Sequence, residues 1–193
     1  MIKEFYICWA LLSMNGVINQ QVICQNADVL HQAANEFNID STLFTALMWE
    51  ESNFDPDLKS YTGKACGISQ VIPKYTDLYD KKVSYKKKKQ EKIRVCNMLK
   101  DPRVGIYYGA KAFSFWYHKY ARKSAQMALC GYNAGYRCKG ESFSEKDLLA
   151  FKRANEIYAP KVLKFYRRLK RKVKKVRKIH KDILSVLKIY IGL

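Results

Sequence analysis

Apolar residues recur at every third or fourth position along most of the chain, which is the spacing of one face of an α-helix. This pattern predicts a helix over residues 28–37, with Asp28 as its N-terminal cap. It predicts a second helix over residues 38–52, capped by Asp40 or by Ser41. Short polar residues favour these positions because their side chains accept hydrogen bonds from the free backbone N–H groups.

The second half of the chain predicts further helices. Asp101 is a candidate cap with Pro102 at the first helical position, and Ser144 with Asp147 forms a candidate capping box. A long basic helix begins at Pro160. The predicted helical segments are 100–120, 123–135, 142–154 and the chain from 160 onward.

Other stretches have no helical pattern. The pair Asp55-Pro56 ends the second helix, since a residue before proline disfavours the helical conformation. A glycine-bearing segment, 61–75, follows, and the lysine-rich stretch 81–92 is too polar to be core, so we expect a solvated loop there. No segment has a clear strand pattern. The fold class predicted is mainly α, with 193 residues forming one domain and a basic helical extension at the C-terminus.

The charge is strongly positive, with 36 Lys and Arg against 17 Asp and Glu, a net charge of +19. We therefore expect an anionic partner, which could be nucleic acid, an acidic polymer or a membrane surface. Charge alone does not choose among them.

The N-terminal residues 1–27 have the layout of a secretory signal peptide, with a lysine, an apolar block from Phe5 to Met14, and then polar residues. Candidate cleavage sites follow Gly16 and Ala27. The alternatives are a buried N-terminal helix and an uncleaved anchor. On this interpretation the protein is exported to the periplasm or cell envelope, with its main domain over 28–169 and a basic amphipathic helix over 170–193.

The six cysteines agree with an oxidising compartment. Cleavage after Ala27 would leave an even set, and cleavage after Gly16 would also keep Cys24. That even set is Cys66, Cys96, Cys130 and Cys138. No C-x-x-C pair occurs and the three histidines are scattered, so we expect no metal site.

Two adjacent glutamates, Glu50 and Glu51, end the second predicted helix. An apolar stripe runs along this helix, formed by Leu43, Phe44, Leu47 and Met48. Glu51 falls almost on the centre line of the stripe, and Glu50 lies roughly a quarter turn away. A carboxyl group in apolar surroundings keeps its proton near neutral pH, as a general acid must. The alternative is that Glu51 is partly exposed at a fraying helix end or paired with a lysine.

Four motifs occur in order: "EESNFDP", "SYTGKACGISQVIP", "GYNAG" and "IYAPKVLKFY". Together they resemble the lytic transglycosylases of the SLT, goose-type-lysozyme-like family, and most of all the small enzymes that accompany type III and type IV secretion and conjugation machines. The resemblance runs from about residue 28 to 169. It implies a lysozyme-like fold.

Carried over by motif, the resemblance makes Glu51 the catalytic glutamate, because it directly precedes the serine of the first motif. The other cleft residues that it implies are Ser60, Gly67, Gln70, Tyr132, Asn133 and Tyr158. Taken singly, these positions could be turn glycines, loop residues and core aromatics. Departures from the family pattern are Ser69 in place of methionine, Gly131 in place of alanine, and Asn155-Glu156 where Thr-Arg often stands.

The resemblance implies cleavage of peptidoglycan with one carboxylate. Glu51 would protonate the bond between N-acetylmuramic acid and N-acetylglucosamine and then act as base while the 6-hydroxyl of the sugar attacks C1. Tyr158 would stabilise developing charge, and Gln70 and Asn133 would bind the sugar amide. No metal or organic cofactor is implied.

Two alternatives remain. A hydrolytic muramidase of the same fold would use Asp55 or Asp57 as its second carboxylate. A nucleic-acid-binding module built on the basic stretches would give Glu51 no role. Export would count against the second alternative, and we expect no nucleic-acid partner.

The cysteines suggest two candidate disulfides. Cys130 and Cys138 flank "GYNAGYR" and could pair with each other. The resemblance, through the N-terminal cysteine of the family, suggests Cys24 with Cys96. Connectivity cannot be deduced from sequence alone.

The C-terminal segment has an apolar seam with alternating steps of four and three residues, surrounded by lysine and arginine. The seam comprises Val162, Tyr166, Leu169, Val173, Val176, His180, Ile183, Leu187 and Tyr190. We expect its early turns to dock on the catalytic domain and its basic faces to contact anionic envelope polymers or lipid head groups. A solvated basic helix without a partner is the alternative.

Overall fold

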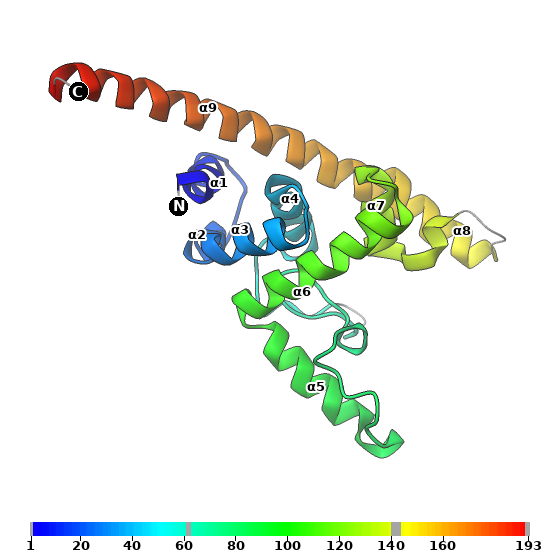
Figure 1. The fold of residues 1–193 in the computed structure, drawn as a ribbon. Coiled ribbons are helices and arrows are strands. Elements are labelled where there is room, and N and C mark those ends of the chain that lie inside the picture. Colours follow the sequence, from blue (N-terminus) through cyan, green and yellow to red (C-terminus); the bar gives the residue numbers. More distant parts are fainter. Residues whose placement is uncertain (1, 61–62, 140–143, 192–193) are drawn as a thin grey trace.

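A computed structural model describes residues 2–60, 63–139 and 144–191 (Figure 1). Within these ranges the chain is helical and has no β-strand, as predicted. Two isolated bridges, between Lys59 and Cys66 and between Cys66 and Val71, are the extended pairings recorded there. The mainly α prediction is therefore confirmed for the described part of the chain.

Most of the helices follow one another with short connections, and the longest connection lies between α4 and η1. The α-helices are α1 (Ile2–Leu12), α2 (Gln20–Gln25), α3 (Ala27–Glu36), α4 (Ser41–Ser52), α5 (Lys88–Leu99), α6 (Pro102–Ser114), α7 (Ala125–Ala134), α8 (Glu145–Lys152) and α9 (Ala159–Ile191). The 3₁₀ helices are η1 (Pro73–Tyr75), η2 (Tyr85–Lys87) and η4 (Gly135–Lys139), and the π-helices are η3 (Phe115–Tyr120) and η5 (Arg153–Tyr158).

Helix α4 lies at the centre of the fold, beneath α9 and between α3 and α7 (Figure 1). Every residue from Thr42 to Met48 is buried, so this helix is enclosed on all sides over two turns. The residues of the predicted apolar stripe are buried, but so are the residues on the other faces of the helix. The last turn of α4, which holds the two glutamates, approaches solvent, as does Ser41 at its other end.

The predicted caps are largely confirmed. Asp40, rather than Ser41, caps α4 by accepting hydrogen bonds from the N–H groups of Thr42 and Leu43. Asp101 caps α6, and Ser144 caps α8 by accepting a bond from the Asp147 N–H. The cap predicted at residue 28 is wrong, because α3 begins at Ala27 and Asp28 lies within its first turn.

The solvated loop predicted over residues 81–92 is only partly present. Its second half opens α5, whose first turns are exposed and charged. Val95 and Leu99 on the later turns are buried against Cys66 and Val71. This tertiary contact stabilises the helix. The lysine-rich sequence gives no sign of it.

Three disulfides form: Cys8–Cys24, Cys66–Cys96 and Cys130–Cys138. The predicted pair Cys130–Cys138 is confirmed, with its Cα atoms 5.8 Å apart. The predicted pairing of Cys24 with Cys96 is wrong, because α2 packs beside α1 whereas α5 packs beside the loop that carries Cys66.

Helix α9 docks on the domain through its early turns, as expected. Val162, Leu169 and Val173 of the predicted seam are buried against the core, and Tyr166, Val176 and His180 are half-buried. Farther along, Ile183 is exposed, and the side chains of Leu187 and Tyr190 lie outside the described residues. Helix α9 packs against α4, α7 and α1 and then projects beyond them (Figure 1).

Helix α1 packs within the fold in this structure. Ile7, Ala10 and Leu11 are buried, and the Tyr6 hydroxyl lies 2.9 Å from Nδ1 of His180 on α9. Among the described helices, none is both long and apolar enough to cross a membrane. Removal of residues 1–27 as a signal peptide stays a prediction.

Candidate active site

Glu51 lies in the last turn of α4, and its side chain is half-buried. The helix ends there because Asn53 adopts the left-handed conformation, with φ 51°. The Tyr158 hydroxyl donates a hydrogen bond to Oε1 of Glu51. Burial raises the pKa of Glu51 to about 7, an effect larger than the lowering by the Tyr158 hydrogen bond. The carboxyl group therefore exchanges its proton near neutral pH.

Two tyrosines from separate elements converge on this carboxyl group. Tyr158 ends the π-helix η5, and Tyr132 lies near the end of α7. Burial, and then the charge of Glu51, raise the pKa of both phenols well above the usual range. Both hydroxyls therefore stay protonated, and they act as hydrogen-bond donors beside Glu51.

Glu50 has different surroundings. Its carboxylate forms an ion pair with Lys161 of α9, at 2.8 Å between Oε1 and Nζ. Lys161 also lies over the ring of Trp49, which stacks on Phe165 with the centroids 4.0 Å apart. Glu50 therefore joins α4 to α9, and it lacks the phenol partner that Glu51 has.

Ser52 holds α4 to the loop that faces Glu51. Its hydroxyl, which is buried, lies 2.7 Å from the carbonyl oxygen of Ile68 and can donate to it. On the other side of the site, the Tyr132 hydroxyl donates to the carbonyl oxygen of Ser69 at 2.7 Å. Two consecutive loop carbonyls are thus fixed against α4 and α7. Ser52 is not among the predicted cleft residues, although it belongs to the Glu-Ser pair of the first motif.

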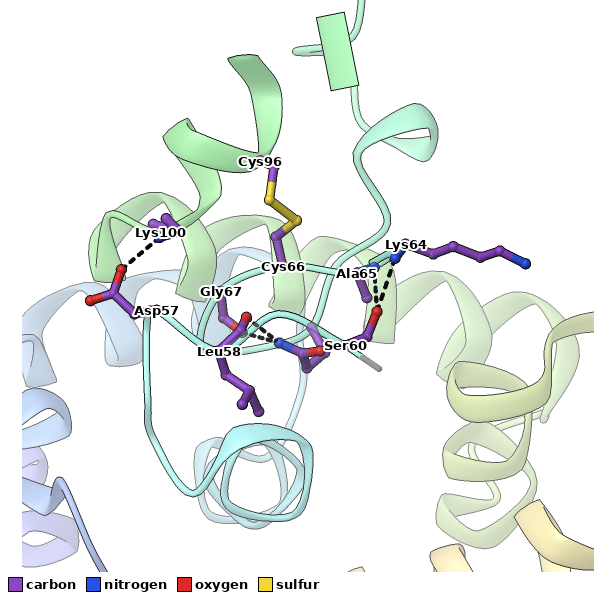
Figure 2. Close-up of a disulfide and its surroundings, with 10 residues drawn as sticks. Asp57, Leu58, Ser60, Lys64, Ala65, Cys66, Gly67, Cys96 and Lys100 are labelled. Carbon is purple, nitrogen blue, oxygen red and sulfur yellow. Dashed lines mark hydrogen bonds and ion pairs between the residues drawn. A yellow bond between two sulfur atoms is a disulfide. The ribbon is translucent and has the colours of Figure 1, made fainter. Parts of the chain in front are cut away.

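The described parts of the loop after α4, residues 57–60 and 63–71, use their own polar groups to hold their shape (Figure 2). The Ser60 hydroxyl accepts hydrogen bonds from the N–H groups of Lys64 and Ala65, at 3.0 Å each. The Gln70 amide donates to the carbonyls of Leu58 and Gly67. These two predicted cleft residues therefore shape the loop, and their contact with substrate stays a prediction.

Gly67 joins this loop to α5. It has φ 76°, and a Cβ atom at this position would lie 2.1 Å from the carbonyl oxygen of Leu99. The Cys66–Cys96 disulfide fixes the same approach from the neighbouring residue (Figure 2). Glycine is required here by both conformation and space.

Asn133 is exposed on α7 beside Tyr132, and its sugar contact stays a prediction. The two aspartates of the hydrolytic alternative have local structural roles. Asp55 accepts a hydrogen bond from the Asp57 N–H, and Asp57 forms an ion pair with Lys100 at 2.8 Å (Figure 2). The described residues include no cluster of metal-ligating side chains.

A comparison with protein families decides the assignment. The family model for the transglycosylase SLT domain matches residues 28–155, more than half of the chain. The chain belongs to the transglycosylase SLT family. It is thus a lytic transglycosylase enzyme, as the four motifs predicted. The SLT match includes Glu51 and Tyr132, while Tyr158 lies just beyond its end.

Relatives of this SLT protein carry uninformative names. Two proteins called X polypeptide from Escherichia coli are 26% and 28% identical to it. These matches cover 81% and 78% of this chain and 82% and 80% of the relatives. A third X polypeptide, from strain K12, is 26% identical over 67% of this chain and 70% of its own length.

A solved structure shares the fold of this SLT protein. It is an inactive mutant of the lytic transglycosylase Slt from Pseudomonas aeruginosa, with a TM-score of 0.56 and 20% identity. The match covers 76% of this chain but only 24% of Slt, so this chain spans about a quarter of the larger protein. The lysozyme-like fold is confirmed.

Proposed function

We propose that this SLT-family enzyme cleaves the β-1,4 bond between N-acetylmuramic acid and N-acetylglucosamine of peptidoglycan without water. Glu51 donates its proton to the glycosidic oxygen as the C1–O bond breaks. The 6-hydroxyl of the same muramic acid attacks C1 and returns a proton to Glu51, which leaves a 1,6-anhydro ring. The enzyme ends in its starting state, and the reaction needs no cofactor.

One observation carries this proposal: a half-buried carboxyl group with a pKa of about 7, held by a neutral phenol. An acid with this pKa is protonated in a large fraction of molecules at neutral pH and can also accept a proton in the second step. The Tyr158 hydroxyl stabilises the Glu51 carboxylate once its proton has left.

The hydrolytic muramidase remains the second candidate, because it would use the same acid. The local bonds of Asp55 and the ion pair of Asp57 with Lys100 favour the non-hydrolytic reaction. The test is mass spectrometry of fragments released from purified peptidoglycan. Fragments lighter by one water than hydrolytic products support the proposal, and reducing muramic ends would assign the hydrolytic reaction instead.

A pair of isosteric mutations tests the acid. Glu51→Gln keeps the shape of the side chain but has no proton to donate, so release of fragments should stop. Glu50→Gln removes only the ion pair with Lys161, and most of the activity should remain. Equal loss in the two variants would contradict the assignment.

We also propose that the protein is exported to the periplasm or cell envelope. The three disulfides support this location, since such bonds persist in oxidising compartments. Cys8 and Cys24 pair with each other, so cleavage after Ala27 would remove both and leave two bridges. Cleavage after Gly16 would remove Cys8 and leave Cys24 without its disulfide partner. Cell fractionation, with mass spectrometry of the mature N-terminus, tests both statements.

From the motif resemblance we propose a role beside a secretion or conjugation machine, where the enzyme would open peptidoglycan locally. Deleting its gene should lower transport or conjugation while the rate of cell growth stays unchanged. An equal loss of growth would indicate general wall turnover instead.

The basic face of α9 supports contact with an anionic envelope component. Five exposed cations follow steps of three and four residues along one side of the helix: Lys164, Arg167, Arg171, Lys174 and Lys178. The first four line a groove between α9 and the start of α4. We propose that this face binds phosphate-bearing head groups of a membrane.

A charge-reversal variant tests this contact. Changing Arg171, Lys174 and Lys178 to Glu should abolish sedimentation with anionic vesicles at low salt. The matched control reverses three exposed lysines of η2 and the start of α5 (Lys86, Lys87 and Lys89) and should bind normally. Equal loss in both variants would mean that net charge alone attracts the protein, and loss of binding to cell walls but not vesicles would assign the face to a wall polymer.

A further inference from the structure

Four aromatic rings pack together on the surface next to the candidate active site. Phe115, Trp116 and Tyr120 come from η3, and Tyr136 comes from η4; we call these residues the aromatic platform. Neighbouring ring centroids lie between 4.9 and 5.3 Å apart, and the Tyr120 hydroxyl donates to that of Tyr136 at 3.2 Å. Tyr136 is nevertheless 56% exposed, and Phe115 and Tyr120 are each 36% exposed.

The backbone supports this arrangement. The three rings of η3 lie on a π-helix, an uncommon conformation that turns consecutive side chains differently from an α-helix. Gly131 of α7 lies directly against Trp116, and a Cβ atom there would be 2.4 Å from the indole ring. The lack of a side chain at residue 131 lets Trp116 pack under the other rings. The exposed rings are therefore held in place by a specific local structure.

The platform lies next to the active-site residue Tyr132. Tyr132 beside Glu51 lies on α7, which leads directly into η4 and Tyr136. Trp116 of the platform lies directly against Gly131, which precedes Tyr132 in the chain. The platform therefore packs on the same helix, α7, that carries Tyr132 beside Glu51.

We propose that the aromatic platform is a sugar-binding subsite for the glycan strand, beyond the sugars held at Glu51. This inference rests on the proposed function. The flat face of a β-linked sugar ring presents C–H groups that pack on an aromatic face, and phenol hydroxyls at the ring edge bond to sugar hydroxyls. Lys139, which lies 4.6 Å from the Tyr120 centroid and 5.3 Å from the Tyr136 centroid, would move aside to the rim.

The experiment measures binding of N-acetylglucosamine oligomers of three and six sugars by calorimetry. An inactive Glu51→Gln background prevents cleavage, and Tyr136→Ala removes the most exposed ring of the platform. We expect the hexamer to bind about threefold to tenfold more weakly, while the trimer, too short to reach the platform, binds as before. Tyr136→Phe keeps the ring and should keep most of the affinity.

Tyr85→Ala is the matched control. Tyr85 is also an exposed tyrosine with a lysine over its ring, Lys88 at 5.3 Å, but it lies on η2. It should leave both affinities unchanged. Equal hexamer binding with and without the Tyr136 ring would overturn the proposal. The proposal would also be overturned if Tyr136→Ala weakened the binding of peptide-bearing muropeptides but not the binding of the hexamer. Cleavage of oligomers by the Glu51→Gln background would instead contradict the proposed function.

Discussion

Replacing Glu51 by glutamine should make the protein inactive and, above neutral pH, more stable. Below pH 4.5 the carboxyl group is protonated in the folded and unfolded states alike, so it adds no pH dependence. Between pH 4.5 and about 7 the unfolded chain releases a proton that the folded chain keeps. The free energy of unfolding therefore falls as pH rises through this window, by about 1.4 kcal/mol per pH unit from this group.

The rise in pKa from 4.5 to about 7 corresponds to a destabilisation of about 3 kcal/mol above pH 7. Water around the half-buried side chain reduces this figure, so we expect about 1–3 kcal/mol in practice. Glutamine at this position cannot ionise, and any loss from its unpaired amide is the same at every pH. The informative quantity is therefore the difference between pH 4 and pH 8 in the stability change caused by Glu51→Gln.

Urea unfolding at pH 4 and pH 8 measures this difference directly. The matched control is Glu156→Gln, which removes an exposed carboxylate from η5 and should change stability equally at both pH values. If Glu51→Gln alters stability by the same amount at pH 4 and pH 8, burial does not raise the pKa of Glu51. The physical basis for assigning it as the acid would then be lost.

Further predictions concern the pH profile, a packing contact and a disulfide. Cleavage should fall as pH rises through about 7, because Glu51 loses the proton that it must donate, and initial rates on purified peptidoglycan measure this. Gly131→Ala should destabilise the protein by about 1–3 kcal/mol through overlap with Trp116, and adding Trp116→Leu should restore part of the loss in thermal unfolding. Replacing Cys66 and Cys96 by alanine should cost about 3–4 kcal/mol, and unchanged unfolding in a reducing agent would contradict this.

Structural features that depend on residues close together in the chain were predicted well from the sequence. The Asp40 cap and the Ser144 capping box each depend on a side chain meeting a backbone N–H two or three residues later. Helix α5 was missed altogether because Val95 and Leu99 stabilise it through contacts with a distant loop. The π-helices also escaped detection, since their residue types do not differ from those of an α-helix.

The periodicity of apolar residues predicted which of the two glutamates faces inward, but it did not predict the partners of either side chain. The apolar stripe predicted that Glu51 faces inward, and the structure places it beside Tyr158. Helix α4 is, however, buried on every side over Thr42–Met48, so the stripe was not the sole inward face. What separates the two side chains is their partners, Tyr158 for Glu51 and Lys161 for Glu50. Both partners lie more than 100 residues away in the sequence, where no local pattern could identify them.

Helix α9 starts directly after Tyr158, with no loop between η5 and its first turn. The predicted boundary between domain and tail at residues 169–170 therefore falls within one uninterrupted helix of 33 residues, about 50 Å long. Such a rod has no hinge along its length. If its projecting end is held on a surface, the angle and height of the Glu51 site above that surface are set as well. The reach of the enzyme would then be a fixed distance, and only glycan strands lying at that distance would meet the acid.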